Sequence, residues 1–276
     1  MMINCKGKTL DFSTPRVMGI LNVSPDSFYD GGKYDSQEKI ALHAEKMVVE
    51  GASIIDIGAV STRPGAEKVS TDIELQKLIP AITAVRNYFP EIIISADTYN
   101  SKAVHKAIEA GADIINDVSG GTADEKMMDT VAKLNVPYII MHIQGTPKEM
   151  QINPFYDNVV ADVMSFFIQQ TNLALSKGIK QIIIDPGFGF GKTVEHNYLL
   201  LSNLSKFQKF GFPILAGISR KSMINKVLGT KPENALNGTT VTNTIALMNG
   251  ADILRVHDVK EAMEAIKIFT FVSNNK

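Results

Sequence analysis

The sequence predicts an α/β protein, a TIM (β/α)8 barrel in which residues 1–276 form a single domain. Three observations support this prediction: short apolar runs recur along the chain, helical segments separate them, and one helix-to-strand joint is repeated. The joint reads GASIID from Gly51, GADIIN from Gly111 and GADILR from Gly250. A doubly wound open sheet is the main structural alternative, and the number of repeats does not exclude it.

Short runs rich in β-branched residues mark the expected strands. The eight runs are residues 17–21, 53–57, 92–96, 113–115, 137–141, 181–184, 213–216 and 252–256. Helical periodicity marks segments between them, for example residues 39–50, 73–88, 101–110, 159–177 and 235–249. Glycines follow these segments where a left-handed cap is wanted, and Thr71-Asp72-Ile73-Glu74 has the pattern of a capping box.

Composition and charge exclude several classes of protein. The chain has 28 basic and 29 acidic residues and a net charge of -1, which argues against a nucleic-acid groove or a membrane-surface patch. No run approaches the roughly 18 apolar residues of a membrane span, and the first 13 residues lack the apolar core of a signal peptide. The single cysteine, Cys5, rules out a disulfide framework and fits a reducing compartment, so a cytoplasmic protein is expected.

Polar residues follow the expected strands one after another. In a (β/α)8 barrel these positions gather at the C-terminal mouth, where the active site lies. A single strand end is often polar for no functional reason, but eight ends rich in Asp, Asn, Arg, Lys and His favour a site. They are Asn22, Ser61-Thr62-Arg63, Asp97, Asn116, His142, Asp185, Ser219-Arg220-Lys221, and Arg255 with His257.

Cationic residues concentrate after the last two strands, in Ser219-Arg220-Lys221 and in Arg255-Val256-His257. Loops at these positions commonly bind phosphate in this fold, so a phosphorylated or pyrophosphorylated ligand is expected. Arg255 and His257 are two residues apart on one strand and therefore share a face.

Asp97, Asn116 and Asp185 lie across the expected mouth and can bind the donor and acceptor edge of a planar heterocycle. Asp56 and Asp117 are interpreted instead as a structural polar layer of the barrel. No His/Asp cluster has close metal-ligand spacing, so a metal cage built by the protein is not expected.

The segment GFGFGKT at residues 187–193 is similar to a P-loop but is one residue short of its spacing. It also lacks the spacing of a dinucleotide-binding fingerprint. We interpret it as a loop whose backbone and aromatic rings line a flat ligand.

Together these segments resemble the dihydropteroate synthase family, the pterin-binding enzymes of folate biosynthesis. The resemblance covers the chain from Arg16 onward and rests on motifs in a fixed order. The motifs are MGILNVSPDSF (18–28), DIG (56–58), STRPG (61–65), SADT (95–98), IINDV (114–118), MH (141–142), DPGFGFGK (185–192), SRKS (219–222) and RVHD (255–258).

The resemblance implies that 6-hydroxymethyl-7,8-dihydropterin pyrophosphate and p-aminobenzoate condense to 7,8-dihydropteroate and pyrophosphate with Mg²⁺. It also implies a homodimer formed through outer helices, and sulfonamides as inhibitors. The implied pterin ligands are Asp97, Asn116, Asp185 and Lys221, with Arg255 stacking on the ring. The implied pyrophosphate ligands are Asn22, Arg255 and His257, with Asn22 also contacting Mg²⁺. The p-aminobenzoate pocket would be shaped by Thr62, Arg63, Pro64, Phe190 and Ser222.

The residues fit a displacement without a covalent enzyme intermediate. An arylamine is a neutral nucleophile at about pH 7, so the reaction needs no dedicated base, and the barrier lies in carbon–oxygen cleavage. Lys221, Arg255 and Asp97 are the residues we expect to be catalytic. Cations at the mouth would stabilise the departing pyrophosphate in a dissociative displacement.

The loops at residues 24–36 and 59–70 leave strand ends, and two interpretations stay open: they close over the site as lids, or they are simple surface loops. Closure of the first loop would bring Asp35 toward the developing cation. Two alternative functions stay open. A methyltetrahydrofolate–corrinoid methyltransferase shares this barrel but needs no pyrophosphate site. A non-catalytic pterin-binding homologue would bind the pterin without turnover.

Overall fold

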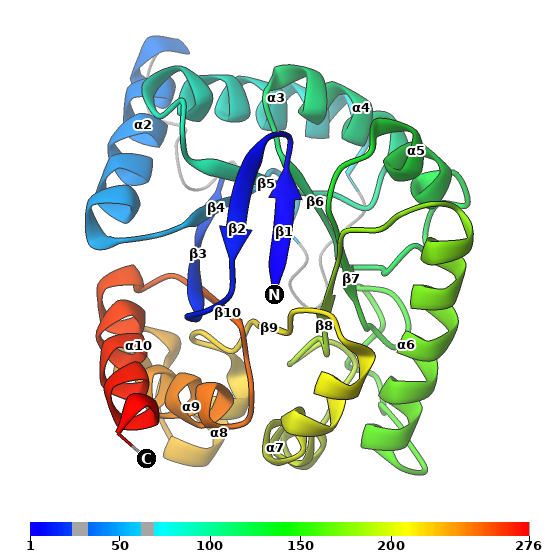
Figure 1. Ribbon diagram of the computed structural model, residues 1–276, viewed down its shortest axis with the longest axis vertical. Coiled ribbons are helices and arrows are strands. Elements are labelled where there is room, and N and C mark those ends of the chain that lie inside the picture. The colour runs from blue at the N-terminus through cyan, green and yellow to red at the C-terminus, as the bar shows by residue number, and fades with distance from the viewer. Residues whose placement is uncertain (24–32, 62–68, 276) are drawn as a thin grey trace.

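Eight parallel strands form one sheet, in the order β8-β7-β6-β5-β4-β3-β10-β9 (Figure 1). The computed structural model describes residues 1–23, 33–61 and 69–275, and the side chains of all of these except residues 33–36. A parallel bridge between Ile184 and Ile214 joins the two ends of the sheet, so it nearly closes into a barrel. The predicted single-domain (β/α)8 barrel is confirmed, and the open doubly wound sheet is excluded.

Each barrel strand overlaps one of the eight runs expected from the sequence. The strand expected at residues 213–216 is shorter, because Pro213 has no N–H to donate and Ile214 forms only the isolated bridge. The strands are β3 (Arg16–Asn22), β4 (Ile54–Gly58), β5 (Ile93–Asp97), β6 (Ile114–Asp117), β7 (Tyr138–Met141), β8 (Ile182–Asp185), β9 (Leu215–Ala216) and β10 (Ile253–Val256).

Helices surround the sheet and follow its strands along the chain (Figure 1). They are α2 (Lys33–Glu50), α3 (Thr71–Tyr88), α4 (Ser101–Ala110), α5 (Met127–Leu134), α6 (Val159–Ser176), α7 (Val194–Ser202), α8 (Ser222–Leu228), α9 (Leu236–Met248) and α10 (Val259–Asn274), with 3-10 turns η1 (Leu204–Phe210) and η2 (Pro232–Asn234). Helix α2 begins before the expected residue 39. Its first turns are polar and carry no apolar periodicity, so the sequence pattern did not predict this earlier start.

The start of α3 corrects the expected capping box. Ser70, one residue earlier than predicted, is the N-cap and accepts the backbone N–H of Ile73 at 3.4 Å. Glu74 therefore has no cap to bond, and its buried carboxylate instead accepts the hydroxyl of Thr98, directly after β5. The helix thus contacts the strand end that carries Asp97.

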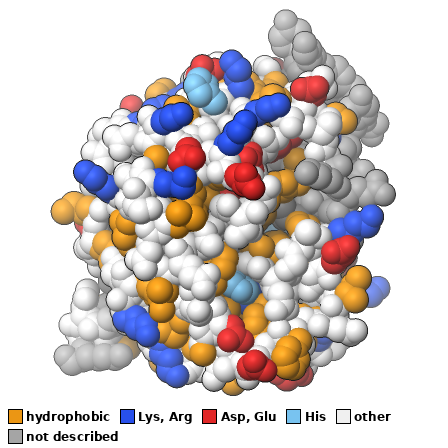
Figure 2. Space-filling model, turned by 90° about the vertical axis from the view of Figure 1, so that its right-hand side faces the viewer, with side chains coloured by type: hydrophobic (Ala, Val, Ile, Leu, Met, Phe, Trp, Pro, Cys, Tyr) orange, Lys and Arg blue, Asp and Glu red, His pale blue; other side chains and the backbone are white. Residues whose placement is uncertain are grey.

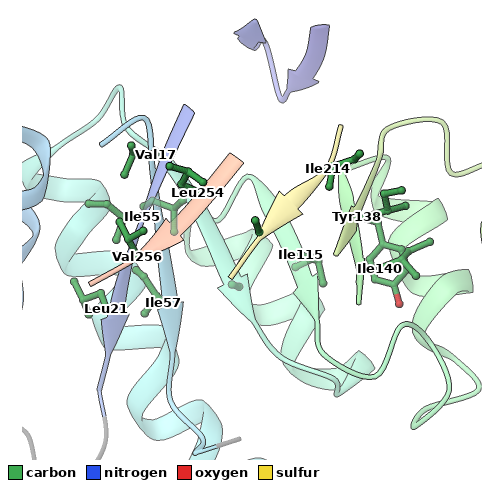
Figure 3. Close-up of a cluster of buried hydrophobic side chains, with 14 of the residues drawn as sticks. Val17, Leu21, Ile55, Ile57, Ile115, Tyr138, Ile140, Ile214, Leu254 and Val256 are labelled. Carbon is green, nitrogen blue, oxygen red and sulfur yellow. The ribbon is translucent and has the colours of Figure 1, made fainter. Parts of the chain in front are cut away.

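Side chains on the outer face of the strands pack against the helices. Val17, Ile55 and Leu254 belong to this outer cluster, which is continuous with the apolar faces of the helices. Figure 3 shows such residues on neighbouring strands, all of them buried. A parallel sheet covered on one face by helices needs this layer, and it explains the dense Ile and Val of the eight runs.

A second apolar cluster fills the barrel interior at the N-terminal ends of its strands, which form the floor of the barrel. Each of the eight strands contributes one residue, and an N-terminal hairpin formed by β1 (Met2–Cys5) and β2 (Lys8–Asp11) contributes more. The members are Ile3, Cys5, Leu10, Phe12, Met18, Ile54, Ile93, Ile114, Ile139, Ile183, Leu215 and Ile253. The hairpin thus covers the floor of the barrel (Figure 1).

The sequence analysis did not predict this hairpin. Its turn places Lys6 and Gly7 at φ 53° and 94°, the left-handed pair that a tight antiparallel connection requires. Lys8 Nζ donates to the carbonyl of Pro90 at 2.8 Å, and Asn4 N donates to Gln181 Oε1 at 3.1 Å. These contacts hold the hairpin against the barrel.

No helix among the described residues is long and apolar enough to cross a membrane. Figure 2 shows the side of the molecule that lies to the right in Figure 1. On its coloured part, basic and acidic side chains are interspersed with single apolar ones, in keeping with the net charge of -1.

Candidate active site

The register of the parallel strands brings three predicted positions, together with Gly58, to one level of the barrel. Asn22 is the partner of Gly58, Gly58 of Asp97, and Asp97 of Asn116. A Cβ atom added to Gly58 would lie 3.4 Å from Asn22 Oδ1 and 3.5 Å from Asp97 Oδ2. Asn22 and Asp97 therefore flank the same small residue at the C-terminal mouth.

Arg255 from β10 is the centre of the site. Its Nε donates to Asp56 Oδ2 at 2.7 Å, and its Nη2 donates to Asp97 Oδ2 at 3.0 Å. Asp56 Oδ2 also accepts Asn116 Nδ2 at 3.1 Å. One guanidinium thus joins two carboxylates from neighbouring strands, and through Asp56 it is connected to the amide of Asn116.

The electrostatic balance of this network is set by burial. Burial and, next, the negative charge of Asp56 raise the pKa of Asp97, and the guanidinium of Arg255 opposes both, so that the resulting pKa is about 7. Asp56 is fully buried, and its Oδ1 has no hydrogen-bond partner. The network therefore holds Arg255 firmly, while the Asp97 carboxyl can titrate near neutral pH.

Asp185 and Lys221 face each other on the other side of the mouth. Asp185 Oδ1 accepts the backbone N–H of Gly187 at 2.8 Å. A Cβ atom added to Gly217 would lie 3.9 Å from both Asp185 Oδ2 and Lys221 Nζ. Burial lowers the pKa of Lys221, Asp185 opposes this fall and Arg255 adds to it, so that the resulting pKa is about 7. Burial also raises the pKa of Asp185, and Lys221 opposes that rise.

The loop after β8 contacts Lys221 directly. Lys221 Nζ donates to the carbonyl of Phe188 and lies 4.5 Å from the centre of the Phe190 ring. An ammonium over an aromatic face is attracted by the ring quadrupole. The aromatic loop predicted to line the ligand therefore lies beside a predicted pterin-binding residue.

Ser219 orients His257 at the end of β10. Ser219 Oγ accepts the backbone N–H of His257 at 3.2 Å and lies 3.0 Å from His257 Nδ1. These two contacts hold the imidazole ring in one orientation at the mouth. Arg220, by contrast, is bound to both oxygens of Asp258 at 2.7 and 2.9 Å and contributes to structure.

The sequence analysis treated Asp56 and Asp117 alike, and the structure separates them. Asp117 is a structural residue, as predicted: it accepts Tyr138 Oη at 2.6 Å and Ser119 Oγ at 2.6 Å. Asp56 also lies in the polar interior of the barrel, but there it bonds to two predicted site residues, Asn116 and Arg255. The two-residue period could have identified it, since Asp56 lies two residues after the inward Ile54, whereas Asp117 follows the inward Asn116 directly.

Some predicted residues lie apart from the network or outside the described chain. Ser222 is the first residue of α8 and is exposed, beside Lys221. Thr62, Arg63 and Pro64 lie outside the described residues, as does most of the first expected lid. Asp35 lies in α2 by its backbone, but its side chain is not among those described.

A cavity of about 350 Å³ opens at the same mouth, over the ends of β5, β6 and β7. Tyr99, Val118, Ser119, Ile143 and Lys148 are among the residues that line it. Its size and mixed lining suit a small organic ligand. Among the described residues, no group of three His, Cys, Asp or Glu side chains could hold a metal ion. The carboxylates and the amide at the mouth can bind a flat polar heterocycle, and the cationic side chains of Arg255 and Lys221 can bind an anionic group beside it.

Known proteins share this arrangement over the whole chain. The profile of the family described as pterin binding enzyme matches residues 18–257. The dihydropteroate synthase of Haemophilus influenzae is 46% identical over 276 residues, covering 99% of this chain and 100% of its own. A Yersinia pestis dihydropteroate synthase in a sulfonamide drug complex superposes with a TM-score of 0.93 at 41% identity, covering 99% and 100% of the two chains. The Xanthomonas albilineans enzyme in complex with 7,8-dihydropteroate gives 0.89 at 36% identity, covering 99% of each chain.

Proposed function

This chain belongs to the pterin-binding enzyme family, and from that premise we propose how its residues carry out the reaction of a dihydropteroate synthase. The enzyme condenses 6-hydroxymethyl-7,8-dihydropterin pyrophosphate with p-aminobenzoate, giving 7,8-dihydropteroate and pyrophosphate for folate biosynthesis. The observation that carries the proposal is the network at the mouth, in which Arg255 is bonded to Asp56 and Asp97.

The pterin is bound at the level of Asp97 and Asn116. Its amino and ring N–H groups match a carboxylate, and its mixed edge matches an amide. Asp185 and Lys221 close the opposite side, where one accepts and the other donates. Arg255, held in place by two carboxylates, offers its guanidinium plane to the face of the pterin ring.

The pyrophosphate is bound by Asn22, Arg255 and His257, which share the mouth end of β3 and β10. Ser219 fixes the His257 ring so that Nε2–H can donate to a phosphate oxygen. Held cations and N–H groups stabilise the negative charge that develops as the carbon–oxygen bond breaks.

The described residues fit a Mg²⁺ ion that arrives with the pyrophosphate. Asn22 supplies a hard oxygen ligand next to Asp97, and Mg²⁺ commonly completes its shell with water and substrate phosphates. When bound, Mg²⁺ neutralises part of the charge on the leaving pyrophosphate. We propose Asn22 as the residue that contacts it.

We propose that Phe190 and Ser222 bind p-aminobenzoate, together with Thr62, Arg63 and Pro64, which lie outside the described residues. Sulfonamides would bind there as competitors, as the drug complex of the Yersinia pestis enzyme suggests. The carbon–oxygen bond breaks and pyrophosphate takes the bonding electron pair. The arylamine nitrogen then attacks the pterin methylene cation, and the amine proton passes to solvent. The reaction requires no covalent enzyme intermediate.

The two alternative functions lose support. Relatives over the full length of the chain are dihydropteroate synthases, which include a product complex. A methyl transfer to a corrinoid would leave Lys221, Arg255 and His257 without a pyrophosphate to bind. We also propose a cytoplasmic location, with which the buried free thiol of Cys5 is compatible.

We propose that a second copy of this chain covers the outer face of α9 and α10, which pack against each other (Figure 1). Large apolar side chains at helical spacing are exposed on both helices. They are Val241, Ile245 and Met248 on α9 and Ile268, Phe271 and Val272 on α10. Contiguous exposed apolar surface of this kind is typical of homodimer interfaces.

The first prediction tests the activity itself. Purified protein with Mg²⁺, the pterin pyrophosphate and p-aminobenzoate should form 7,8-dihydropteroate, measured by mass spectrometry, and chelation of Mg²⁺ should slow it. Lys221→Ala should lower kcat/KM by at least about 10²-fold, because it removes a held donor from the pterin site. Lys226→Ala, an exposed lysine of the same helix, is the matched control and should keep wild-type activity. Pterin binding without product in the wild type would contradict the proposed function.

The second prediction concerns pH. Asp97 must be ionised to accept the pterin N–H groups, and its pKa is raised to about 7, chiefly by burial, so kcat/KM for the pterin substrate should fall on the acid side as the pH drops below that value. Loss of the Lys221 proton, whose pKa is also about 7, lowers the alkaline side, so the midpoint of the acid side is the one that reports Asp97. Asp56→Asn removes the neighbouring negative charge and should move the midpoint to lower pH. Asp129→Asn, exposed on α5, should not move it. Substrate ionisation is common to all three proteins, so an unchanged midpoint in Asp56→Asn would exclude this role of Asp97.

The third prediction concerns the dimer. Light scattering with size-exclusion chromatography should give twice the chain mass for the wild type. Met248→Lys places a charge in the apolar face and should shift the protein toward the monomer, whereas Leu42→Lys, an equally drastic change on exposed α2, should not. A monomeric wild type at micromolar concentration would contradict the proposed interface.

A further inference from the structure

The loop after β8 is held by side chains along its whole length. Each of the five carbonyl oxygens from residue 187 to residue 191 accepts a hydrogen bond from a side chain. The donors are Lys192 to Gly187 O and Phe190 O, Lys221 to Phe188 O, Gln151 to Gly189 O and Tyr156 to Gly191 O. Lys192 is the donor that bonds to this loop twice.

Lys192 is buried and has partners for all its donors. Its Nζ lies 2.8 Å from His142 Nδ1, 2.9 Å from Gly187 O and 3.0 Å from Phe190 O. Burial lowers the pKa of Lys192 well below its usual range, and Asp185 opposes this. The loop contacts survive deprotonation, because a neutral amine still has two N–H groups for the two carbonyls and a lone pair for His142.

The glycines of the GFGFGK segment permit this arrangement. Gly187 has φ 70°, and a Cβ atom there would lie 1.9 Å from the carbonyl oxygen of His142. Gly191 has φ 63°, and a Cβ atom there would lie 2.6 Å from Gln144 O. A P-loop directs N–H groups at an anion, whereas this loop directs carbonyl oxygens at its own lysine.

Lys192 bonds to the loop at Gly187 and at Phe190, and the contacts of Lys221 lie within this stretch. Gly187 lies immediately before Phe188, whose carbonyl accepts Lys221 Nζ, and Phe190 carries the ring beneath that Nζ. A shift of the loop would therefore move both contacts of Lys221 at once.

We propose that Lys192 is a positioning residue, which fixes the loop so that Phe188 O and the Phe190 ring hold Lys221 in place for substrate binding. The inference rests on the proposed function, since Lys221 and Phe190 are assigned there to the pterin and p-aminobenzoate sites. It assigns a role to the last residue of the GFGFGK segment, which touches no substrate itself.

Lys192→Met tests this role. It removes the lysine donor of Phe190 O and one of the two donors of Gly187 O, which keeps the backbone N–H of Phe190. The loop should therefore shift, and displacement of reacting groups by about 1 Å can cost about 10²-fold in rate. We expect kcat/KM to fall between about 10-fold and 10²-fold and the KM for p-aminobenzoate to rise. In calorimetry with the pterin pyrophosphate alone, the Kd should rise by about 10-fold with unchanged stoichiometry per folded molecule. Lys206→Met, an exposed lysine, is the matched control and should match the wild type.

Lys192→Gln retains two N–H groups on a shorter side chain and should give an intermediate effect. A purely structural role would lower stability or the number of active molecules but leave KM and Kd of the remaining enzyme unchanged, and that result would overturn the inference. Failure of both variants to fold would overturn it as well, because Lys192 would then be needed for the fold. If the wild type forms no product in the same assay, it is the proposed function that fails.

Discussion

Side chains along each barrel strand alternate between the inside and the outside of the barrel, and the position of the site depends on this alternation. In β10, Ile253 belongs to the inner cluster, Leu254 to the outer one, and Arg255 again points inward to Asp56 and Asp97. A shift of one residue would place such charges among the helices. The apolar floor, the charged mouth and the helix contacts therefore follow from one period.

The charges inside the barrel are tolerable because opposite charges lie near one another. Arg255 shares its donors between two carboxylates, and Asp185 and Lys221 both lie near Gly217. Breaking buried ion pairs such as those of Arg255 is costly, so its guanidinium is held before any ligand arrives. The loop of residues 187–191 extends this order outward, since Lys192 and Lys221 both bond to its carbonyls. The site is thus organised in advance for a substrate that carries both a polar ring and a strong anion.

Much of this was predictable from the sequence, for physical reasons. All eight strands and the inward Asn116, Asp185 and Arg255 follow from composition and period. The hairpin was missed because two four-residue strands carry too little pattern, and its pairing is visible only where it meets the barrel floor. The bonds of Asp56 and Lys192 were not predicted, because they join partners distant in the chain, such as Arg255 and His142.

We infer that the mouth lowers the barrier by stabilising the charges of carbon–oxygen cleavage, without a base or a covalent intermediate. This mechanism is tested most directly by positional isotope exchange in pterin pyrophosphate labelled with ¹⁸O at the oxygen that bridges the pterin methylene and the α-phosphorus. Incubated with enzyme and Mg²⁺ but without p-aminobenzoate, the label should move from the bridge to non-bridging positions, because cleavage precedes attack by the amine. Retention of the label in the bridge by enzyme that turns over normally would contradict the account.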